Sequence, residues 1–196
     1  VQKREMIAEI AATLAFSAIQ NNDKVGLMFF TDKIEKFIPP KKGKKHILLL
    51  IREMLEFKPE SNGTDINMAL EYLTGTLKKR CATFIVSDFI DTHDYYKSMS
   101  IASRKHDLTA IQVYDKREAQ LPDVGLMKLL DAESGEMKWI DTSSKKVRQA
   151  YNKWWYERQL NMNVTMQRCK VDVASVATDE DYVKSLMGLF KKRGAK

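Results

Sequence analysis

The chain has 196 residues, of which 44% are apolar and 30% are charged, and its formal net charge at pH 7 is +7. A globular domain of this size buries about 70% of its unfolded surface, so folding needs neither a disulfide nor a metal. No apolar run approaches the roughly 20 residues that cross a bilayer, and the first residues do not have the pattern of a signal peptide.

The hydrophobic pattern predicts a helix over residues 3–20, with apolar side chains three and four residues apart. No capping residue precedes this helix, so we expect the domain to be truncated at its N-terminus. The apolar run at 24–31 predicts a buried strand. The turn at Asp32-Lys33 then predicts an antiparallel partner strand at 34–38, closed by Pro39-Pro40.

The same pattern predicts the rest of the chain as alternating helices and strands. We expect helices at 45–56, 65–77, 94–105, 143–167 and 179–193, strands at 82–87, 108–114 and 171–176, and a hairpin of 126–130 with 136–140 around a turn at 131–135. Strands separated by helices of ten or more residues predict an α/β domain with a Rossmann-like, doubly wound, mostly parallel sheet. No repeat or linker divides the chain, so we expect residues 1–196 to form a single domain.

Two smaller features are also informative. Cys81 and Cys169 lack metal-type spacing and adjoin strand-like stretches, so we expect buried or half-buried free thiols in a reducing, cytoplasmic compartment. On the helix at 143–167, Tyr151, Trp154 and Trp155 share one face, and we expect that face to pack on the sheet, with Tyr156 or one tryptophan left exposed.

Ligands of doubly wound sheets bind at the carboxyl ends of the strands. Two polar segments are predicted there, Ser61-Asn-Gly-Thr-Asp65 before a helix and Ser87-Asp-Phe-Ile-Asp91 after a strand. The Thr64 hydroxyl and the Asp88 carboxylate are hard oxygen ligands of the kind that Mg²⁺ binds. Asp65, Ser87 and Asp91 are the further candidates around them. Spacing alone leaves a second interpretation open, in which these residues are helix caps and turn residues.

The ordered set of motifs resembles a family of bacterial von Willebrand factor A-like proteins known as domain of unknown function 58, often found beside MoxR-type AAA+ ATPases. The resemblance covers nearly the whole chain. It includes Asp23-Lys-Val-Gly-Leu27, Gly63-Thr-Asp65, Val86-Ser-Asp-Phe89, His106-Asp107, Tyr114-Asp115 and Glu118-Ala-Gln-Leu-Pro122.

This resemblance implies a metal-ion-dependent adhesion site. In such sites an Asp-x-Ser-x-Ser loop after the first strand supplies three ligands, and a Thr and an Asp from later loops join it. Thr64 and Asp88 match the latter two positions, whereas Asp-x-Ser-x-Ser does not occur in this sequence. The resemblance therefore implies an incomplete metal site, with Mg²⁺ or Mn²⁺ bound in the full-length protein and none bound by this chain.

The resemblance also implies a gap in the sheet. The first strand of the von Willebrand factor A fold lies between the strands that correspond to 24–31 and 82–87. Without it, two rows of backbone groups lack partners, and each such group costs about 1–3 kcal/mol when buried. We expect that the missing strand lies outside these residues or that another segment fills its place.

The function that we expect is protein–protein interaction rather than catalysis. The implied partner is a MoxR-type ATPase or its client, and membrane proximity would come from segments outside this chain. Basic clusters at 41–45, 78–80 and 191–193 are scattered and lack interleaved aromatics, so we expect solvated surface rather than a nucleic-acid site. The alternative is a Mg²⁺-dependent phosphotransferase or hydrolase, suggested by Asp88 and Asp91. However, such enzymes usually pair carboxylates two apart, and no Gly-rich phosphate loop is present.

Overall fold

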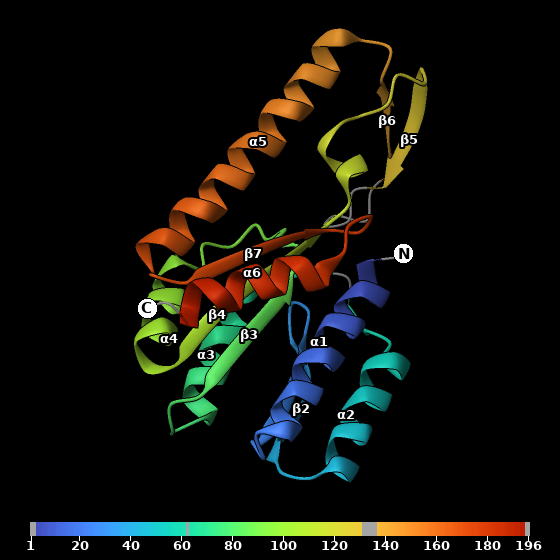
Figure 1. Ribbon diagram of the computed structural model, residues 1–196. Coiled ribbons are helices and arrows are strands. Elements are labelled where there is room, and N and C mark those ends of the chain that lie inside the picture. The colour runs from blue at the N-terminus through green and yellow to red at the C-terminus, as the bar shows by residue number, and fades with distance from the viewer. Residues whose placement is uncertain (1–2, 62, 131–136, 195–196) are drawn as a thin grey trace.

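The alternation of helices and strands expected from the sequence is present in the computed structural model, which describes residues 3–61, 63–130 and 137–194 (Figure 1). The elements in chain order are α1 (Lys3–Gln20), β1 (Val25–Phe30), β2 (Ile34–Lys41), α2 (Lys44–Glu56), α3 (Ile66–Thr76), β3 (Ala82–Ser87), α4 (Tyr96–Lys105), β4 (Asp107–Tyr114), the short 3₁₀-helix η1 (Lys116–Ala119), β5 (Leu126–Leu130), β6 (Met137–Asp141), α5 (Lys145–Arg168), β7 (Asp172–Ala177) and α6 (Tyr182–Gly194).

A parallel three-stranded sheet forms the centre of the domain, with strand order β3-β4-β7. In its register, Ala82 pairs with Asp107 and Thr109 pairs with Asp172. The α/β class and the parallel sheet are therefore confirmed. Strands β1 and β2 form a separate antiparallel pair, with Met28 opposite Phe37, as expected from the short turn between them.

The described strands do not form one continuous sheet, in agreement with the gap expected between 24–31 and 82–87 and with the hairpin expected at 126–140. The described strands form three sheets, of which β1-β2 and β5-β6 are antiparallel pairs. The physical reason is that β1 and β3 are not hydrogen-bonded to each other, so the β1-β2 pair does not extend the central sheet. Strand β2 also runs through Pro39 and Pro40 to Lys41, because proline is tolerated in a strand at a sheet edge.

Helices pack on both the β1-β2 pair and the central β3-β4-β7 sheet. On one face, Met6 and Ile10 of α1 pack on Ile111 and Val113 of β4, and Ala15 of the same helix packs with α2. On the other face, α3, α4 and α5 share one core cluster, on which Met28 and Phe30 of β1 also pack. The two sheets therefore share their helical layers, although no described strand lies between β1 and β3 in hydrogen-bonding register.

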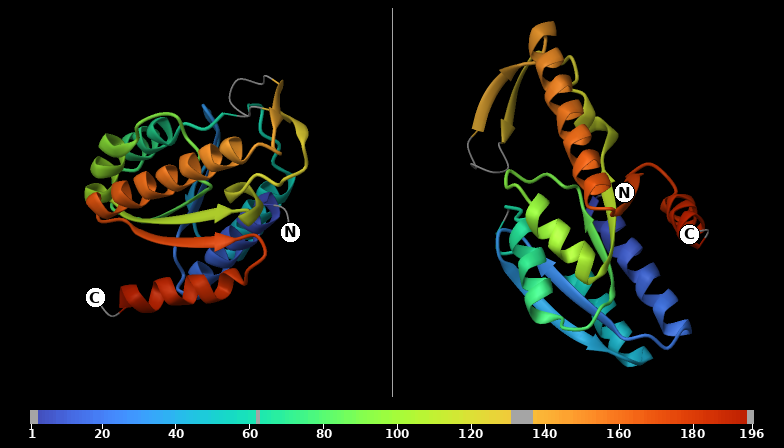
Figure 2. Two further views of the ribbon diagram at one scale, coloured as in Figure 1. Left: turned by 90° about the horizontal axis from the view of Figure 1, so that it is seen from above. Right: turned by 90° about the vertical axis from the view of Figure 1, so that its left-hand side faces the viewer.

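Helix α5 and the β5-β6 hairpin project from the sheet (Figure 2). Of the 24 residues of α5, only Met162 and Met166 are buried, both near its C-terminal end. Trp154 is 45% exposed and Tyr156 is 68% exposed, whereas Tyr151 and Trp155 are half-buried, so the expected exposure of Tyr156 or one tryptophan is confirmed, but the face as a whole does not pack on the sheet. The reason is that the N-terminal half of α5 extends beyond the strands, where Tyr151, Trp154 and Trp155 contact one another instead.

Several smaller expectations can also be compared with the structure. Cys81 is partly exposed and Cys169 is buried, and both are free thiols, as expected. The turn predicted at 131–135 lies outside the described residues. Among the helices that the structure describes, none combines the length and the apolar character needed to span a bilayer.

Candidate functional site

Loops from three parts of the chain meet at the carboxyl end of β3. The backbone amide of Asp65 donates to the carbonyl of Thr31, just after β1, at 2.9 Å. The next amide, that of Ile66, donates to Oδ2 of Asp91 at 2.7 Å. Three candidate residues, Thr64, Asp65 and Asp91, therefore lie in one region, although they come from loops that are far apart in the sequence.

Within this region the acidic side chains accept hydrogen bonds from the backbone. Asp65 is the N-cap of α3, and its Oδ1 accepts from the amide of Met68 at 2.8 Å. Asp91 has a side chain with 0% exposure, and its Oδ1 accepts from the amide of His93 at 2.8 Å. Both carboxylates thus have the capping and turn roles that the sequence left open as an alternative.

His93 is a member of this group that the sequence did not single out. Its Nδ1 lies 2.8 Å from Oδ1 of Asp91, and ligand atoms of Asp65, Asp91 and His93 lie within 4.8 Å of one another. The hydrogen bond with Asp91 is the main cause that raises the pKa of His93, and the charge of Asp65 and the backbone of Thr64 act in the same direction. The imidazole is therefore stabilised as a cation beside two carboxylates.

Asp88 makes a different set of contacts, which include a lysine from the start of the chain. Its Oδ2 lies 3.1 Å from Nζ of Lys3, and its Oδ1 accepts from the amide of Ile90 at 3.0 Å. The same Nζ lies 2.7 Å from Oε1 of Glu118. Burial opposes the charge of Lys3, but hydrogen bonds and attraction from both carboxylates outweigh it and raise its pKa.

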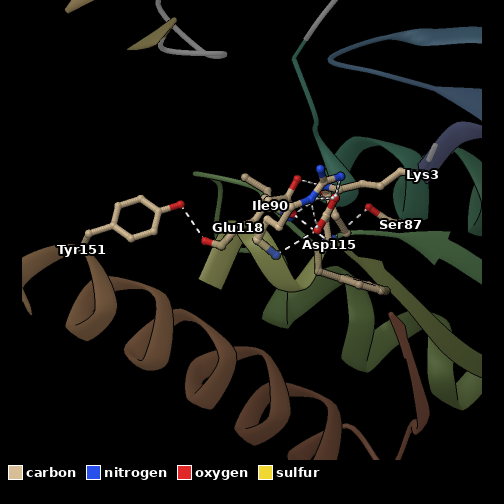
Figure 3. Close-up of polar contacts among 9 residues, drawn as sticks. Lys3, Ser87, Ile90, Asp115, Glu118 and Tyr151 are labelled. Atoms are coloured by element: carbon tan, nitrogen blue, oxygen red, sulfur yellow. Dashed lines mark hydrogen bonds and ion pairs between the residues drawn. The ribbon is translucent and has the colours of Figure 1, made fainter. Parts of the chain in front are cut away.

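Glu118 is positioned by the 3₁₀-helix η1 that follows β4. Asp115 and Glu118 form a capping box at its start, with the amide of Asp115 3.5 Å from Oε2 of Glu118. Arg117 donates to Asp115 and lowers the pKa of that carboxyl to about 2. The hydroxyl of Tyr151 in α5 donates to the carbonyl of Glu118 at 2.7 Å (Figure 3). The Lys3–Asp88–Glu118 group is therefore linked to α1, β3, β4 and α5.

Ser87 shapes the loop that carries Asp88 and Asp91. Its Oγ accepts from the amide of Phe89 at 3.0 Å. Phe89 is buried and has a φ of 55°, a left-handed conformation that costs energy for a bulky residue. Arg158 of α5 donates to the carbonyls of Phe89 and Asp91, at 3.4 and 3.3 Å. Ser87 therefore supports the turn, and the strained loop is fixed from both sides.

A pocket of about 430 Å³ lies between this loop and α5. It is lined by Asp91, His93 and Tyr95 from the loop and by Trp154 and Arg158 from the helix, among others. The guanidinium of Arg158 stacks 5.3 Å from the centre of the Trp154 ring. The pocket therefore joins the carboxyl end of β3 to the projecting helix.

The ability of these residues to bind a metal can be judged from the contacts they already make. The carboxylates of Asp65 and Asp91 are engaged by backbone amides. Asp88 and Glu118 also accept from backbone amides, those of Ile90 and Asp115, but in addition they converge on the positive nitrogen of Lys3. Asp88 therefore fits the part of a cation ligand, and Glu118 is a second candidate that the sequence prediction missed.

Comparisons with known proteins agree with this description of the fold. The chain is 23% identical to uncharacterized proteins of Mycobacterium bovis and Mycobacterium tuberculosis over 99% of its length, and it spans 62% of the length of those relatives. A crystal structure of a conserved hypothetical protein, BatB of Bacteroides thetaiotaomicron, superposes with a TM-score of 0.56 and 15% identity, covering 96% of this chain and 89% of that one. An aerotolerance-related membrane protein of Bacteroides fragilis superposes with a TM-score of 0.50 and 12% identity, covering 92% and 85%.

These structural neighbours share the fold and, at such low identity, do not transfer a function. The sequence match is more specific, because the model of the family described as "Protein of unknown function DUF58" matches residues 1–160. The matched span contains α1, β1, α3, β3 and η1, the elements that carry the residues at the carboxyl end of the sheet. The chain belongs to the DUF58 family.

Proposed function

We propose that this domain is a protein-interaction module whose contact face is the carboxyl end of β3 and β4, and that it is not an enzyme. The observation that carries the proposal is the convergence of Asp88 and Glu118 on one positive charge, at 3.1 and 2.7 Å. Loops at the carboxyl ends of parallel strands are the usual ligand-binding region of such sheets. The neighbouring pocket beside α5 adds aromatic and charged side chains, which favour protein recognition.

The proposal includes a divalent cation, Mg²⁺ or Mn²⁺, at this face. Asp88 would hold the ion, Glu118 would join it, and Thr64 is the hydroxyl ligand that the family resemblance implies. When bound, such an ion supplies an open coordination position that a carboxylate of the partner can fill. Asp65, Ser87 and Asp91 keep the surrounding loops in place through backbone hydrogen bonds.

We further propose that the fold is of the von Willebrand factor A type. In this proposal one further strand lies between β1 and β3 and joins the β1-β2 pair to the β3-β4-β7 sheet. The strand order is then β2, β1, the further strand, β3, β4 and β7. The support is that α1 and the α3 side of the core already cover both sheets. Such a strand would come from outside the described residues, either from the same protein or from another chain.

The partner that we propose is a MoxR-type ATPase or the client on which it acts. The support is the family resemblance, in which such ATPases accompany these domains. We propose a cytoplasmic location close to a membrane, reached through segments outside this chain, because one structural neighbour is described as an aerotolerance-related membrane protein. No nucleic acid is part of this proposal.

The test is direct binding of the purified full-length protein to the purified MoxR-type ATPase of the same organism, by biolayer interferometry in Mg²⁺ and in EDTA. We expect Asp88→Asn and Thr64→Ala each to weaken binding at least about tenfold, which corresponds to 1.4 kcal/mol. The matched control is Glu60→Gln, which removes a surface carboxylate paired with Lys33. Equal binding by Asp88→Asn and wild type, or no binding at all, would refute the proposal.

A further inference from the structure

We infer that the ammonium group of Lys3 and a divalent cation compete for one position between Asp88 and Glu118, so that Lys3 is a tethered competitor that closes the cation site. This inference rests on the proposed cation-dependent contact and adds a means of regulating it. In the closed state Lys3 supplies the positive charge. In the open state Lys3 swings away and the ion takes its place.

The geometry leaves room for only one cation. Nζ of Lys3 lies 3.1 Å from Oδ2 of Asp88 and 2.7 Å from Oε1 of Glu118, so it occupies the space where both carboxylates converge. A Mg²⁺ ion needs carboxylate oxygens at about 2.1 Å. An ion bound to either carboxylate would therefore lie within a few ångströms of the ammonium.

Limited solvent access makes it still less favourable for Lys3 and a divalent cation to occupy the site together. The side chains of Lys3, Asp88 and Glu118 are only 25%, 28% and 34% exposed. The ammonium carries one positive charge and the ion carries two, and their repulsion is stronger at a partly buried position than in bulk water, because the effective dielectric constant is lower there. Simultaneous occupation by Lys3 and a divalent ion is therefore unfavourable.

The two carboxylates have supports that do not involve Lys3. Asp88 accepts from the amide of Ile90 at 3.0 Å, and Glu118 belongs to the capping box of η1. The main chain of Glu118 is also anchored by Tyr151. Lys3 itself is the first residue of α1, and that helix is anchored further along by Met6 and Ile10. Departure of the lysine side chain therefore leaves both acidic groups in place.

The experiment is a calorimetric titration of the full-length protein with Mn²⁺ in the absence of any partner. We expect Lys3→Met to tighten Mn²⁺ binding at least about tenfold relative to wild type. Lys3→Arg keeps the charge and should bind like wild type. The matched control, Lys33→Met, removes a lysine that pairs with the exposed Glu60 and should also leave binding unchanged. Adding Glu118→Gln to Lys3→Met should remove most of the gain.

The inference is overturned if Lys3→Met binds Mn²⁺ no more tightly than wild type, or if the gain survives Glu118→Gln. Absence of Mn²⁺ binding in every variant overturns it as well, and this readout is independent of whether the protein binds an ATPase. Thermal melts of each variant identify any loss of folding. Lys3→Gln is a second neutral variant that must reproduce the gain if Lys3→Met folds poorly.

Discussion

The backbone amide of Ile66 donates to Oδ2 of Asp91 across 2.7 Å, which joins the first turn of α3 to the loop after β3. The preceding amide, that of Asp65, binds the carbonyl of Thr31 after β1. Because Asp91 also accepts from His93, one buried carboxylate organises a region to which three loops contribute. Asp91 is therefore central to the shape of the proposed contact face even if it never touches a ligand.

Replacing Asp91 with Ala should destabilise the protein markedly. The change leaves the part-buried amide of Ile66 without its acceptor, which costs about 1–3 kcal/mol, and it also removes the ion pair with His93 and the acceptor of the exposed His93 amide. We expect a loss of about 2–4 kcal/mol in the free energy of unfolding, measured by urea denaturation. Asp179→Ala is the control, because its exposed ion pair with Lys116 is worth about 0–1 kcal/mol. Equal losses for the two variants would contradict the role of Asp91.

The interaction of His93 with Asp91 predicts a pH dependence. The pKa of His93 in the folded protein is raised above its unfolded value, which is about 6.5. The stabilisation from this pair is therefore fully present below pH 6.5 or so, and it is lost as pH rises through the folded pKa. In the His93→Gln variant the loss of stability should be larger at pH 5.5 than at pH 8.5.

An NMR titration of the His93 ring gives the folded pKa directly and must show a value above that of an unfolded reference peptide. If wild type and His93→Gln differ by the same amount at both pH values, the proposed charge interaction is wrong. The Asp91→Ala variant supplies the control titration, in which the raised pKa of His93 should return toward its ordinary value.

Long, strongly patterned elements could be predicted from the sequence. The bounds of α1 at 3–20 and of β3 at 82–87 follow from apolar spacing and from a continuous apolar run. The four-residue helix η1 was not predicted, because so short a segment has no hydrophobic period. The break between β1 and β3 agrees with the gap that the family resemblance implies, although the pattern of either strand alone does not report it.

The candidate site was predictable only where local rules decide it. Asp65 precedes a helix and Asp91 follows a strand, so their capping and turn roles could be anticipated from position. The Lys3–Asp88 pair joins residues 85 positions apart, and no spacing rule connects them. Glu118 carried one local signal, because Asp115 and Glu118 have the spacing of a capping box. That signal places the side chain at η1 but does not reveal the lysine it meets.

Attachment of the projecting helix α5 to the domain should depend on its few buried residues. Met166 is fully buried in the main core cluster, so Met166→Ala should lower the free energy of unfolding by about 2–5 kcal/mol. Leu160→Ala, on the same helix but 49% exposed, should change it by about 0.5 kcal/mol or less. Urea denaturation followed by tryptophan fluorescence and by circular dichroism gives both values. A larger effect at Leu160 would show that another surface covers this helix.

The unpaired edges of β1 and β3 predict an uneven pattern of amide hydrogen exchange. Strand β4 is hydrogen-bonded on both sides, by β3 and by β7, whereas β3 is paired only with β4 among the described strands. In residues 1–196 alone, the amides of β4 at Ile111 and Val113 should exchange slowest. About half of the amides of β3 point away from β4, because hydrogen bonding alternates along a strand, and these should exchange far faster.

In the full-length protein a strand that fills the position between β1 and β3 would slow those β3 amides by orders of magnitude and leave β4 nearly unchanged. Mass spectrometry or NMR on both proteins measures this difference. Uniform protection along β3 in the shorter chain would mean that the edge is already covered, and the proposed additional strand would be wrong.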